Sequence, residues 1–399
     1  MSLLDRLRAG GFDRGGFLAI SLAASGLGAA WQDGPAGAVT EWQSSDPDPA
    51  QLAELEAELR PRWVWWSPTT AQQLTRAGLR VATCWDLAAV HRLLFGGWRA
   101  EPDLVWAGLH DLPADSLPGV GQLDLLGHSG DEGTDPEQPV RPDGHLRPEW
   151  VGGGWQRSPA RLARWSATAL AARQLQEQRI WAMPQPARIA ATARSESAAE
   201  LLCAELTVDG LPVELARAEQ LLASYIGPRP TEAAEASRLR ERRDSAVLRL
   251  VPGAEDTDLR NPGQVRAMLA RAGIDVPDTR SWRLENFRGA HPVIEALLAW
   301  RKAERIATTY GYEWLDRNVS ADGRLRGSWT GSDGAAGRMT ASAGLHNLPA
   351  DLRPAIAAGD GWLFVRADLG QIEPRVLAAV SGDRALARAT QDDDLYAPV

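Results

Sequence analysis

The stretch VRADLGQIEPRVLAAVSGD, residues 365–383, brings an acid, a cluster of polar groups and a change of hydrophobic spacing together. An apolar run at 362–365 leads into it, and such a run is typical of a strand buried on both faces of a sheet. Over 371–380 the apolar residues stand four positions apart, which predicts one face of a helix. The pattern therefore places Asp368 at a strand-to-helix junction.

The first turn of this predicted helix is unusually polar. It carries Gln371, Glu373 and Arg375, and Pro374 fits there because its missing N–H costs nothing in a first turn. A helix N-terminus favours a phosphate, and a carboxylate such as Asp368 suits Mg²⁺. A two-metal site would use that carboxylate as a bridging ligand for in-line attack on a phosphate. From the residues alone, a cap or turn role for this acid is the more common alternative.

Size and composition set limits on the class of protein. The 399 residues allow two or three domains, and an apolar fraction of 44% with 24% charged residues is ordinary for a globular protein. The net charge of −9 argues against a generally basic surface, although a local cleft can still be basic. The sequence lacks an apolar run of membrane-spanning length and a secretory signal. With only Cys84 and Cys203, it predicts a protein of the reducing cytoplasm without a zinc cluster.

The N-terminal part reads as a small α/β unit over residues 1–127. Residues 128–158 are rich in Gly, Pro and acids without apolar periodicity, which predicts a disordered linker. In the first part we expect strands within 17–31, 37–43 and 62–67 and a helix over 50–60. Beyond the linker we expect helices over 159–182 and 196–207, a strand within 206–214, mainly helices over 215–317, and strands and loops from about 323.

The segment DLGQIEPRVLAAVSGD resembles motif A of family A DNA polymerases, the bacterial DNA polymerase I type, usually written DYSQIELRVLAHLSGD. Leu369 and Gly370 stand where Tyr-Ser is usual, and Pro374 stands where Leu is usual. The Glu-Pro-Arg variant is similar to the actinobacterial branch known as bifunctional 3′-5′ exonuclease/DNA polymerase.

A second segment, SDGAAGRMTASAGLHNLP at 332–349, resembles the family's TATGRLSSSNPNLQNIP. Arg338 and Asn347 align, while His346 stands where Gln is usual. In the family this Arg reaches the minor groove at the primer terminus. The acceptors there are common to all base pairs, so a donor can test pairing geometry without reading sequence. Taken alone, the same residue could be a surface loop arginine.

The resemblance covers roughly 159–399. Residues 196–214 are similar to the start of the polymerase domain, and 261–311 to its thumb side, where the Arg-rich helix 238–250 could contact phosphates or form a solvated face. The implied fold is an α/β and α+β multidomain protein. The implied domains are a degenerate RNase H-like exonuclease domain (1–127), the linker (128–158) and the N-terminal part of a polymerase domain (159–399) with its thumb at about 215–320 and palm motif A at 362–383.

The resemblance also assigns roles to single residues. It implies that Asp368 is a catalytic metal ligand and that Glu373 crowds the sugar 2′ position and so excludes ribonucleotides. Gln371 and Arg375 would position Glu373 and the template or primer. The implied set of substrate- and DNA-binding residues is Arg338, Gln371, Arg375, His346 and Asn347.

The implied cofactor is Mg²⁺ in a two-metal site, and the implied partners are primer–template DNA and deoxynucleoside triphosphates. The resemblance further implies a monomer that acts in replication or repair at the nucleoid, in the cytoplasm. In the family, a fingers Lys and a His-Asp-Glu hairpin follow motif A. Here the single lysine is Lys302 and no His follows His346, so we expect an incomplete, inactive polymerase fragment. The alternative is a non-catalytic protein that binds primer–template DNA.

Exonuclease chemistry in this family needs an Asp-x-Glu pair on the first strand and often a Tyr-x-x-x-Asp motif. The one Asp-x-Glu here is Asp135–Glu137, inside the predicted linker, and every tyrosine lies beyond the N-terminal unit. We therefore expect this unit to be structural and without exonuclease activity.

Overall fold

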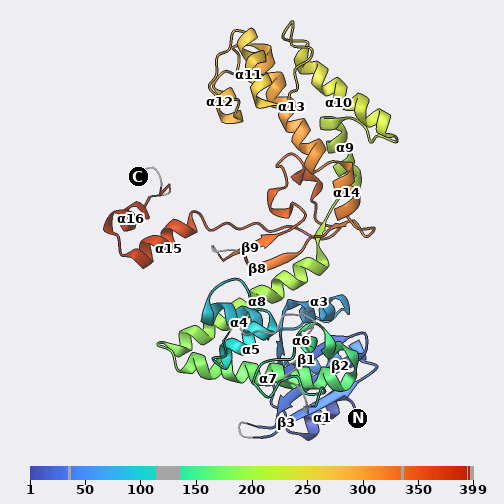
Figure 1. The fold of residues 1–399 in the computed structure, drawn as a ribbon, viewed down its shortest axis with the longest axis vertical. Coiled ribbons are helices and arrows are strands. Elements are labelled where there is room, and N and C mark those ends of the chain that lie inside the picture. Colours follow the sequence, from blue (N-terminus) through green and yellow to red (C-terminus); the bar gives the residue numbers. More distant parts are fainter. Residues whose placement is uncertain (35–36, 114–134, 334–336, 393, 396–399) are drawn as a thin grey trace, which may run out of the picture. The chain divides into compact units, whose positions relative to one another are not determined.

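The computed structural model describes residues 1–34, 37–113, 135–333, 337–392 and 394–395 (Figure 1). The chain forms two compact units, Met1–Ala355 and Ile356–Val399. In the described part of the chain, no helix is long and apolar enough to cross a membrane.

The first unit begins with a mixed five-stranded sheet in the order β3-β2-β1-β4-β5. The first three strands pair antiparallel, while β4 runs parallel to β1 and β5 parallel to β4. These strands confirm the predicted α/β pattern. Their bounds are β1 Phe17–Ala23, β2 Gly26–Gln32, β3 Val39–Ser44, β4 Arg62–Trp65 and β5 Cys84–Asp86.

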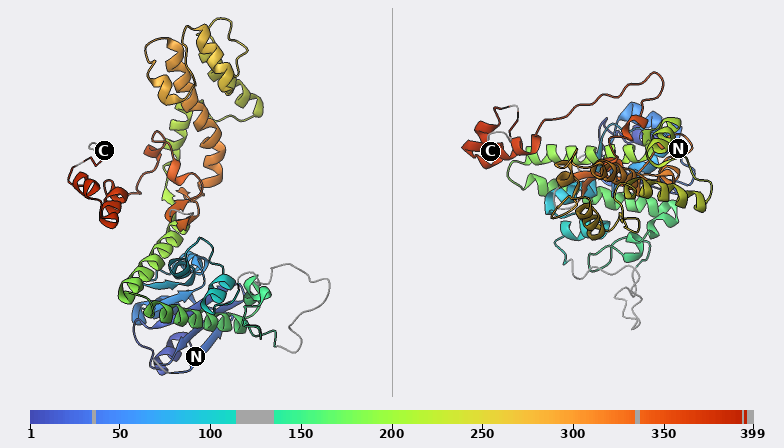
Figure 2. Two further views of the ribbon diagram at one scale, coloured as in Figure 1. Left: turned by 60° about the vertical axis from the view of Figure 1, so that its left-hand side comes forward. Right: turned by 90° about the horizontal axis from the view of Figure 1, so that it is seen from above.

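Helices cover both faces of the sheet. Alternate residues of a strand point to opposite faces, so neighbouring residues of one strand belong to different cores. Leu18 and Ile20 belong to a core shared with α1–α3, whereas Ala19 between them belongs to a second core shared with α4, α5 and α7. Helix α7 runs along this second face (Figure 1, Figure 2). The bounds are α1 Leu3–Ala9, α2 Pro49–Leu59, α3 Pro68–Arg76, α4 Leu87–Phe95, α5 Pro102–Leu109 and α7 Pro159–Trp181.

The predicted linker is wrong over its described part, residues 135–158, while 128–134 lie outside the described residues. This part holds α6 Pro148–Val151, the short 3₁₀ helix Gly154–Arg157 and a bridge between Val140 and Leu146. Trp150 is fully buried and lies near Trp165 of α7. Trp150, together with arginine side chains that donate to backbone carbonyl oxygens of residues 135–138, therefore anchors a segment whose composition has no periodic signal.

A mainly helical region follows, as predicted. Helices α10–α13 enclose a third core that includes Val265, Leu269 and Leu297. The predicted strand within 206–214 is mostly wrong, since α8 continues to Asp209 and only two residues pair in β6. The bounds are α8 Pro186–Asp209, α9 Leu215–Ile226, α10 Ala233–Leu248, α11 Pro262–Arg271, α12 Ser281–Glu285, α13 Pro292–Thr309 and α14 Tyr312–Asn318.

Two small antiparallel pairs close the first unit, β6 with β7 and β8 with β9. Their bounds are β6 Leu211–Pro212, β7 Arg324–Leu325, β8 Trp329–Asp333 and β9 Arg338–Ala341, followed by 3₁₀ helices at Leu345–Asn347 and Arg353–Ala355.

The second unit contains α15 Ile372–Ser381 and α16 Arg384–Ala389. The helix predicted after Asp368 is confirmed. The buried strand predicted at 362–365 is wrong, because these residues form no strand and Val365 is 93% exposed. A strand needs a hydrogen-bonded neighbour, and the described residues of this unit contain no strand that could pair with it.

Candidate nucleic-acid interface

The β8–β9 hairpin presents Arg338 at the first position of β9. Its backbone pairs with that of Asp333, and its side chain is exposed. Gly337 just before it has a φ of 60°, a left-handed conformation that a glycine adopts without strain. The hairpin therefore holds a long cationic side chain at the protein surface, next to an irregularity in the strand pairing between Thr330 and Asp333.

The loop after β9 carries His346 and Asn347, and its backbone is fixed from two sides. The Tyr310 hydroxyl donates to the carbonyl oxygen of Asn347 at 2.8 Å, and Trp314 Nε1 donates to that of Ala343 at 3.0 Å. The ring of His346 lies edge-on to Trp329 of β8, with 5.2 Å between centroids. The structure thus brings His346 and Asn347 to the strand pair that bears Arg338.

Sequence reasoning missed the contact that fixes the loop with Asp351. The single lysine of the chain makes this contact. Lys302 Nζ donates to Asp351 Oδ1 at 2.7 Å, and the Tyr225 hydroxyl donates to the same oxygen at 3.0 Å. The hydrogen bond between the two side chains raises the pKa of Lys302 and lowers the pKa of Asp351. These partners lie 49 and 126 positions from Asp351, so no local motif could have indicated the cluster.

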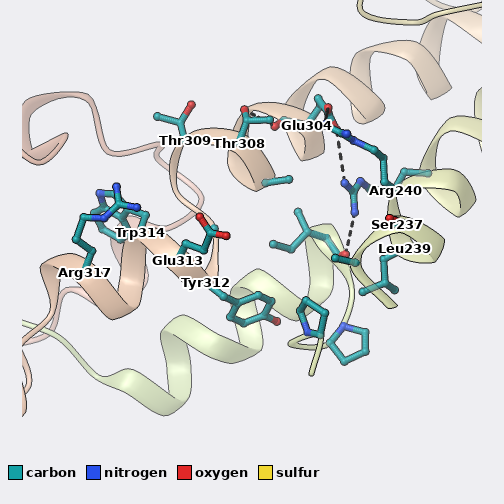
Figure 3. A pocket seen from close by; sticks show the side chains of 17 residues that line it. Ser237, Leu239, Arg240, Glu304, Thr308, Thr309, Tyr312, Glu313, Trp314 and Arg317 are labelled. Carbon is teal, nitrogen blue, oxygen red and sulfur yellow. Dashed lines mark hydrogen bonds and ion pairs between the residues drawn. The ribbon is translucent and has the colours of Figure 1, made fainter. Parts of the chain in front are cut away.

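A cavity of about 510 Å³ lies between α9, α10, α13 and α14. Figure 3 shows Trp314 and Arg317 on one side of it and Arg240 on the other, with Glu304 between. The cationic side chains of α10 are partly neutralised there, since Arg240 and Arg243 lie 3.6 Å and 3.5 Å from the Glu304 carboxylate. Arg238 and Arg242 of the same helix are exposed.

In the second unit, Asp368 is exposed and precedes α15, and Glu373 is exposed in its first turn. Gln371 caps the helix in a left-handed conformation with a φ of 54°. Its side-chain amide donates to Asp394 at 2.8 Å and accepts from the Leu395 backbone at 2.8 Å.

Arg375 also binds the end of its own unit. Its guanidinium donates to the carbonyl oxygens of Gly370 at 3.1 Å and Thr390 at 2.6 Å. Gln371 and Arg375 therefore fix the segment after α16, an arrangement that sequence reasoning did not anticipate. Within the described ranges, no group of three or more His, Cys, Asp or Glu side chains is placed to hold a metal ion.

The C-terminal part of the chain is similar in sequence to known proteins. Residues 253–399 match the profile of DNA polymerase family A. A segment of 122 residues is 38% identical to thermostable DNA polymerase I of Thermus filiformis, covering 29% of this chain and 14% of that protein. DNA polymerase I of Mycobacterium tuberculosis is 34% identical over 115 residues, covering 27% of this chain and 12% of the relative. The matched region thus spans only a small part of these relatives.

The fold is similar to that of a solved polymerase domain. The POL domain of Pol1 from M. smegmatis, solved in complex with DNA primer-template and dNTP, matches with a TM-score of 0.58 and 20% identity. The match covers 99% of this chain and 64% of that one, so the mixed α/β architecture resembles that domain.

Proposed function

Because residues 253–399 match the profile of DNA polymerase family A, we propose that the protein is a template-directed DNA polymerase that extends a primer 3′ end. The observation that carries this proposal is that both motif-like segments, 332–349 and 365–383, fall inside the matched region. Its partners would be primer–template DNA and deoxynucleoside triphosphates, bound by a monomer in the cytoplasm during replication or repair.

Asp368 is the proposed metal ligand. Its exposed carboxylate is a hard oxygen donor, and Mg²⁺ is commonly held by one or two carboxylates together with water and substrate phosphates. When bound, Mg²⁺ would polarise the attacked phosphate and lower the pKa of the attacking hydroxyl. In this proposal Glu373 excludes the ribose 2′-OH by occupying its space, while Gln371 and Arg375 position Glu373 and the template or primer.

Arg338 is the proposed contact to the primer end. A guanidinium on a surface strand can donate to the minor-groove acceptors that all base pairs share. The fixed loop with His346 and Asn347 would lie beside the same groove. This contact would raise affinity for a correctly paired primer terminus without a preference for its sequence.

We propose that the N-terminal sheet is a degenerate exonuclease domain with a structural role. Strand β1, FLAISLA, carries no carboxylate. The one Asp-x-Glu pair is engaged, since Glu137 accepts from Arg161 at 2.7 Å and Glu137 Oε2 accepts from Arg161 Nε at 3.1 Å. Asp86 at the end of β5 is buried and accepts from Trp65 Nε1 at 2.9 Å. These carboxylates are occupied by hydrogen bonds within the fold.

The test is Mg²⁺-dependent primer extension by the protein expressed from its complete reading frame. Asp368→Ala is expected to lower extension at least about a hundredfold, as losses of electrostatic catalytic groups do. Asp360→Ala, an exposed acid of the same segment, is the control and should keep full activity. Normal extension by Asp368→Ala would refute the proposed role. DNA binding by a wild-type protein that does not extend the primer would favour the non-catalytic binding protein instead.

A further inference from the structure

Taking the proposed polymerase function as a premise, we propose that Glu200 is a positioning residue. It would hold the β8–β9 hairpin, and with it Arg338, at a fixed distance from the N-terminal sheet. The domain built around the five-stranded sheet β1–β5, which we call the sheet domain, would then contribute to primer–template binding through α8. It would do so without placing a side chain on the DNA.

The Glu200 carboxylate lies between two parts of the first unit. Its side chain is 4% exposed and forms an ion pair with Arg92 of α4, whose side chain is 14% exposed. On its other side, the backbone N–H of Gly331 in β8 donates to Glu200 Oε2 at 3.3 Å. One buried carboxylate thus connects a helix of the sheet domain with the hairpin.

The hairpin approaches Glu200 this closely because residue 331 is glycine. A Cβ at Gly331 would lie 3.0 Å from Glu200 Cδ and 3.1 Å from Oε1, closer than such atoms normally stand. Two residues earlier, the Trp329 N–H donates to Thr207 Oγ1 at 2.9 Å. Thr207 stands seven positions after Glu200, about two helical turns, so both contacts come from the same face of α8. Trp329 and Gly331 of β8 therefore both contact α8. Figure 1 shows the strand beside the end of that helix.

The same turn of α8 is also fixed to the sheet. The Asp86 N–H of β5 donates to Ser197 Oγ at 3.0 Å, and Cys84 Sγ donates to the Ser197 carbonyl oxygen at 3.2 Å. Ser197 lies three positions before Glu200, in the same turn. Because this turn is bonded to β5 and to β8 at once, a displacement of the hairpin relative to the sheet must break hydrogen bonds that are at least partly buried.

The experiment is a double-mutant cycle on the affinity of the full chain for a primer–template duplex with a recessed 3′ end. Gly331→Ala pushes the hairpin away from the carboxylate and is expected to weaken binding about tenfold, which corresponds to about 1.4 kcal/mol. Glu200→Ala removes the group against which the added methyl group would press. In that background Gly331→Ala should change affinity less than about twofold, and this non-additivity distinguishes positioning from general damage. Gly359→Ala, where an added Cβ would meet no atom within 4 Å, is the control and should leave affinity unchanged.

Hydrogen exchange of the same variants without DNA separates this inference from the proposed function. We expect faster exchange of the amides of β8 and β9 in Glu200→Ala and Gly331→Ala, with unchanged exchange in β1 and β2. If the wild-type chain fails to bind the duplex, the proposed function fails, and exchange alone decides whether Glu200 holds the hairpin. Unchanged exchange in the hairpin, or equal effects of Gly331→Ala in both backgrounds, would overturn the inference. Should Glu200→Ala not fold because it leaves Arg92 unpaired, Arg92→Leu/Glu200→Ala takes its place.

Discussion

Two buried titratable groups of the sheet domain respond to pH in opposite directions. Burial, and then the nearby Glu200 carboxylate, raise the pKa of Asp86 to about 7. Burial, and then the adjacent Arg92, lower the pKa of His91 to about 4. Stability from protonated Asp86 is present below its unfolded pKa and is lost as pH rises towards 7. Stability from neutral His91 is present at high pH and is lost as pH falls below its unfolded pKa, so the two effects oppose each other between about pH 4 and 6.5.

Replacing one of these groups should reveal the other. Asp86→Asn removes the carboxyl group whose protonation stabilises the fold at low pH. The free energy of unfolding should therefore rise more steeply from pH 5 to 6.5 in this variant than in the wild type. Above pH 6.5 the wild type should lose stability up to about pH 7, and the variant should not. The measurement is the midpoint of thermal unfolding at half-unit pH steps. Parallel curves for the two proteins would show that Asp86 does not titrate in this range.

At the scale of elements, α7 packs closely on β2 in the sheet domain. This packing depends on Gly28, where a Cβ would lie 2.1 Å from the backbone of Leu162 and Ala163. Ser166 of the same helix donates to the Gly28 carbonyl oxygen at 3.0 Å. Since the obstacle is backbone and not a flexible side chain, a larger residue at this position must displace the whole helix.

Gly28→Ala is therefore expected to cost about 3 kcal/mol of unfolding free energy or more, at the upper end of overpacking effects. Urea unfolding followed by circular dichroism measures this change. Gly359→Ala is the matched control, because a Cβ there would meet no atom within 4 Å, and it should change stability by less than about 0.5 kcal/mol. A similar small change in both variants would mean that α7 is not held at this distance.

At the scale of the whole molecule, the question is how a chain of net charge −9 could bind a polyanion. Helix α10 offers a partial answer, because Arg240 and Arg243 share the single Glu304 carboxylate, which also pairs with Arg260, and Arg238 and Arg242 are exposed. Affinity for DNA would then depend on a few local cations and not on the overall field.

This view predicts a particular salt dependence. Replacing both exposed arginines, Arg238→Gln/Arg242→Gln, should reduce the slope of log affinity against log salt by about 0.9 for each lost phosphate contact. Arg6→Gln, an exposed change in α1, should leave the slope unaltered. The measurement is fluorescence anisotropy with a labelled primer–template duplex across a salt series. An unchanged slope in the double variant would mean that α10 is the solvated helix face that its sequence equally allows.

Prediction from sequence failed where packing at long range decides the outcome. The apolar run at 362–365 has the composition of a buried strand but no strand to pair with in the described part of its unit, and composition cannot supply a partner. The described part of the expected linker, 135–158, is ordered by Trp150 near Trp165. The anchors Lys302 and Glu200 carry no local signal, because their partners are distant in the chain.

The sequence by itself determined most of the local elements and the resemblance to DNA polymerase family A, because hydrophobic periodicity, turn residues and motif spacing act over a few positions. It was enough to predict the strands of the N-terminal sheet, the helix after Asp368 and the candidate residues of both motif-like segments. Only the tertiary structure decided what holds those residues: Tyr310 and Trp314 on the loop of Asn347, and Glu200 on the strand before Arg338. The physical reason is that hydrogen bonds and packing contacts join groups that lie close in space, wherever they stand in the chain.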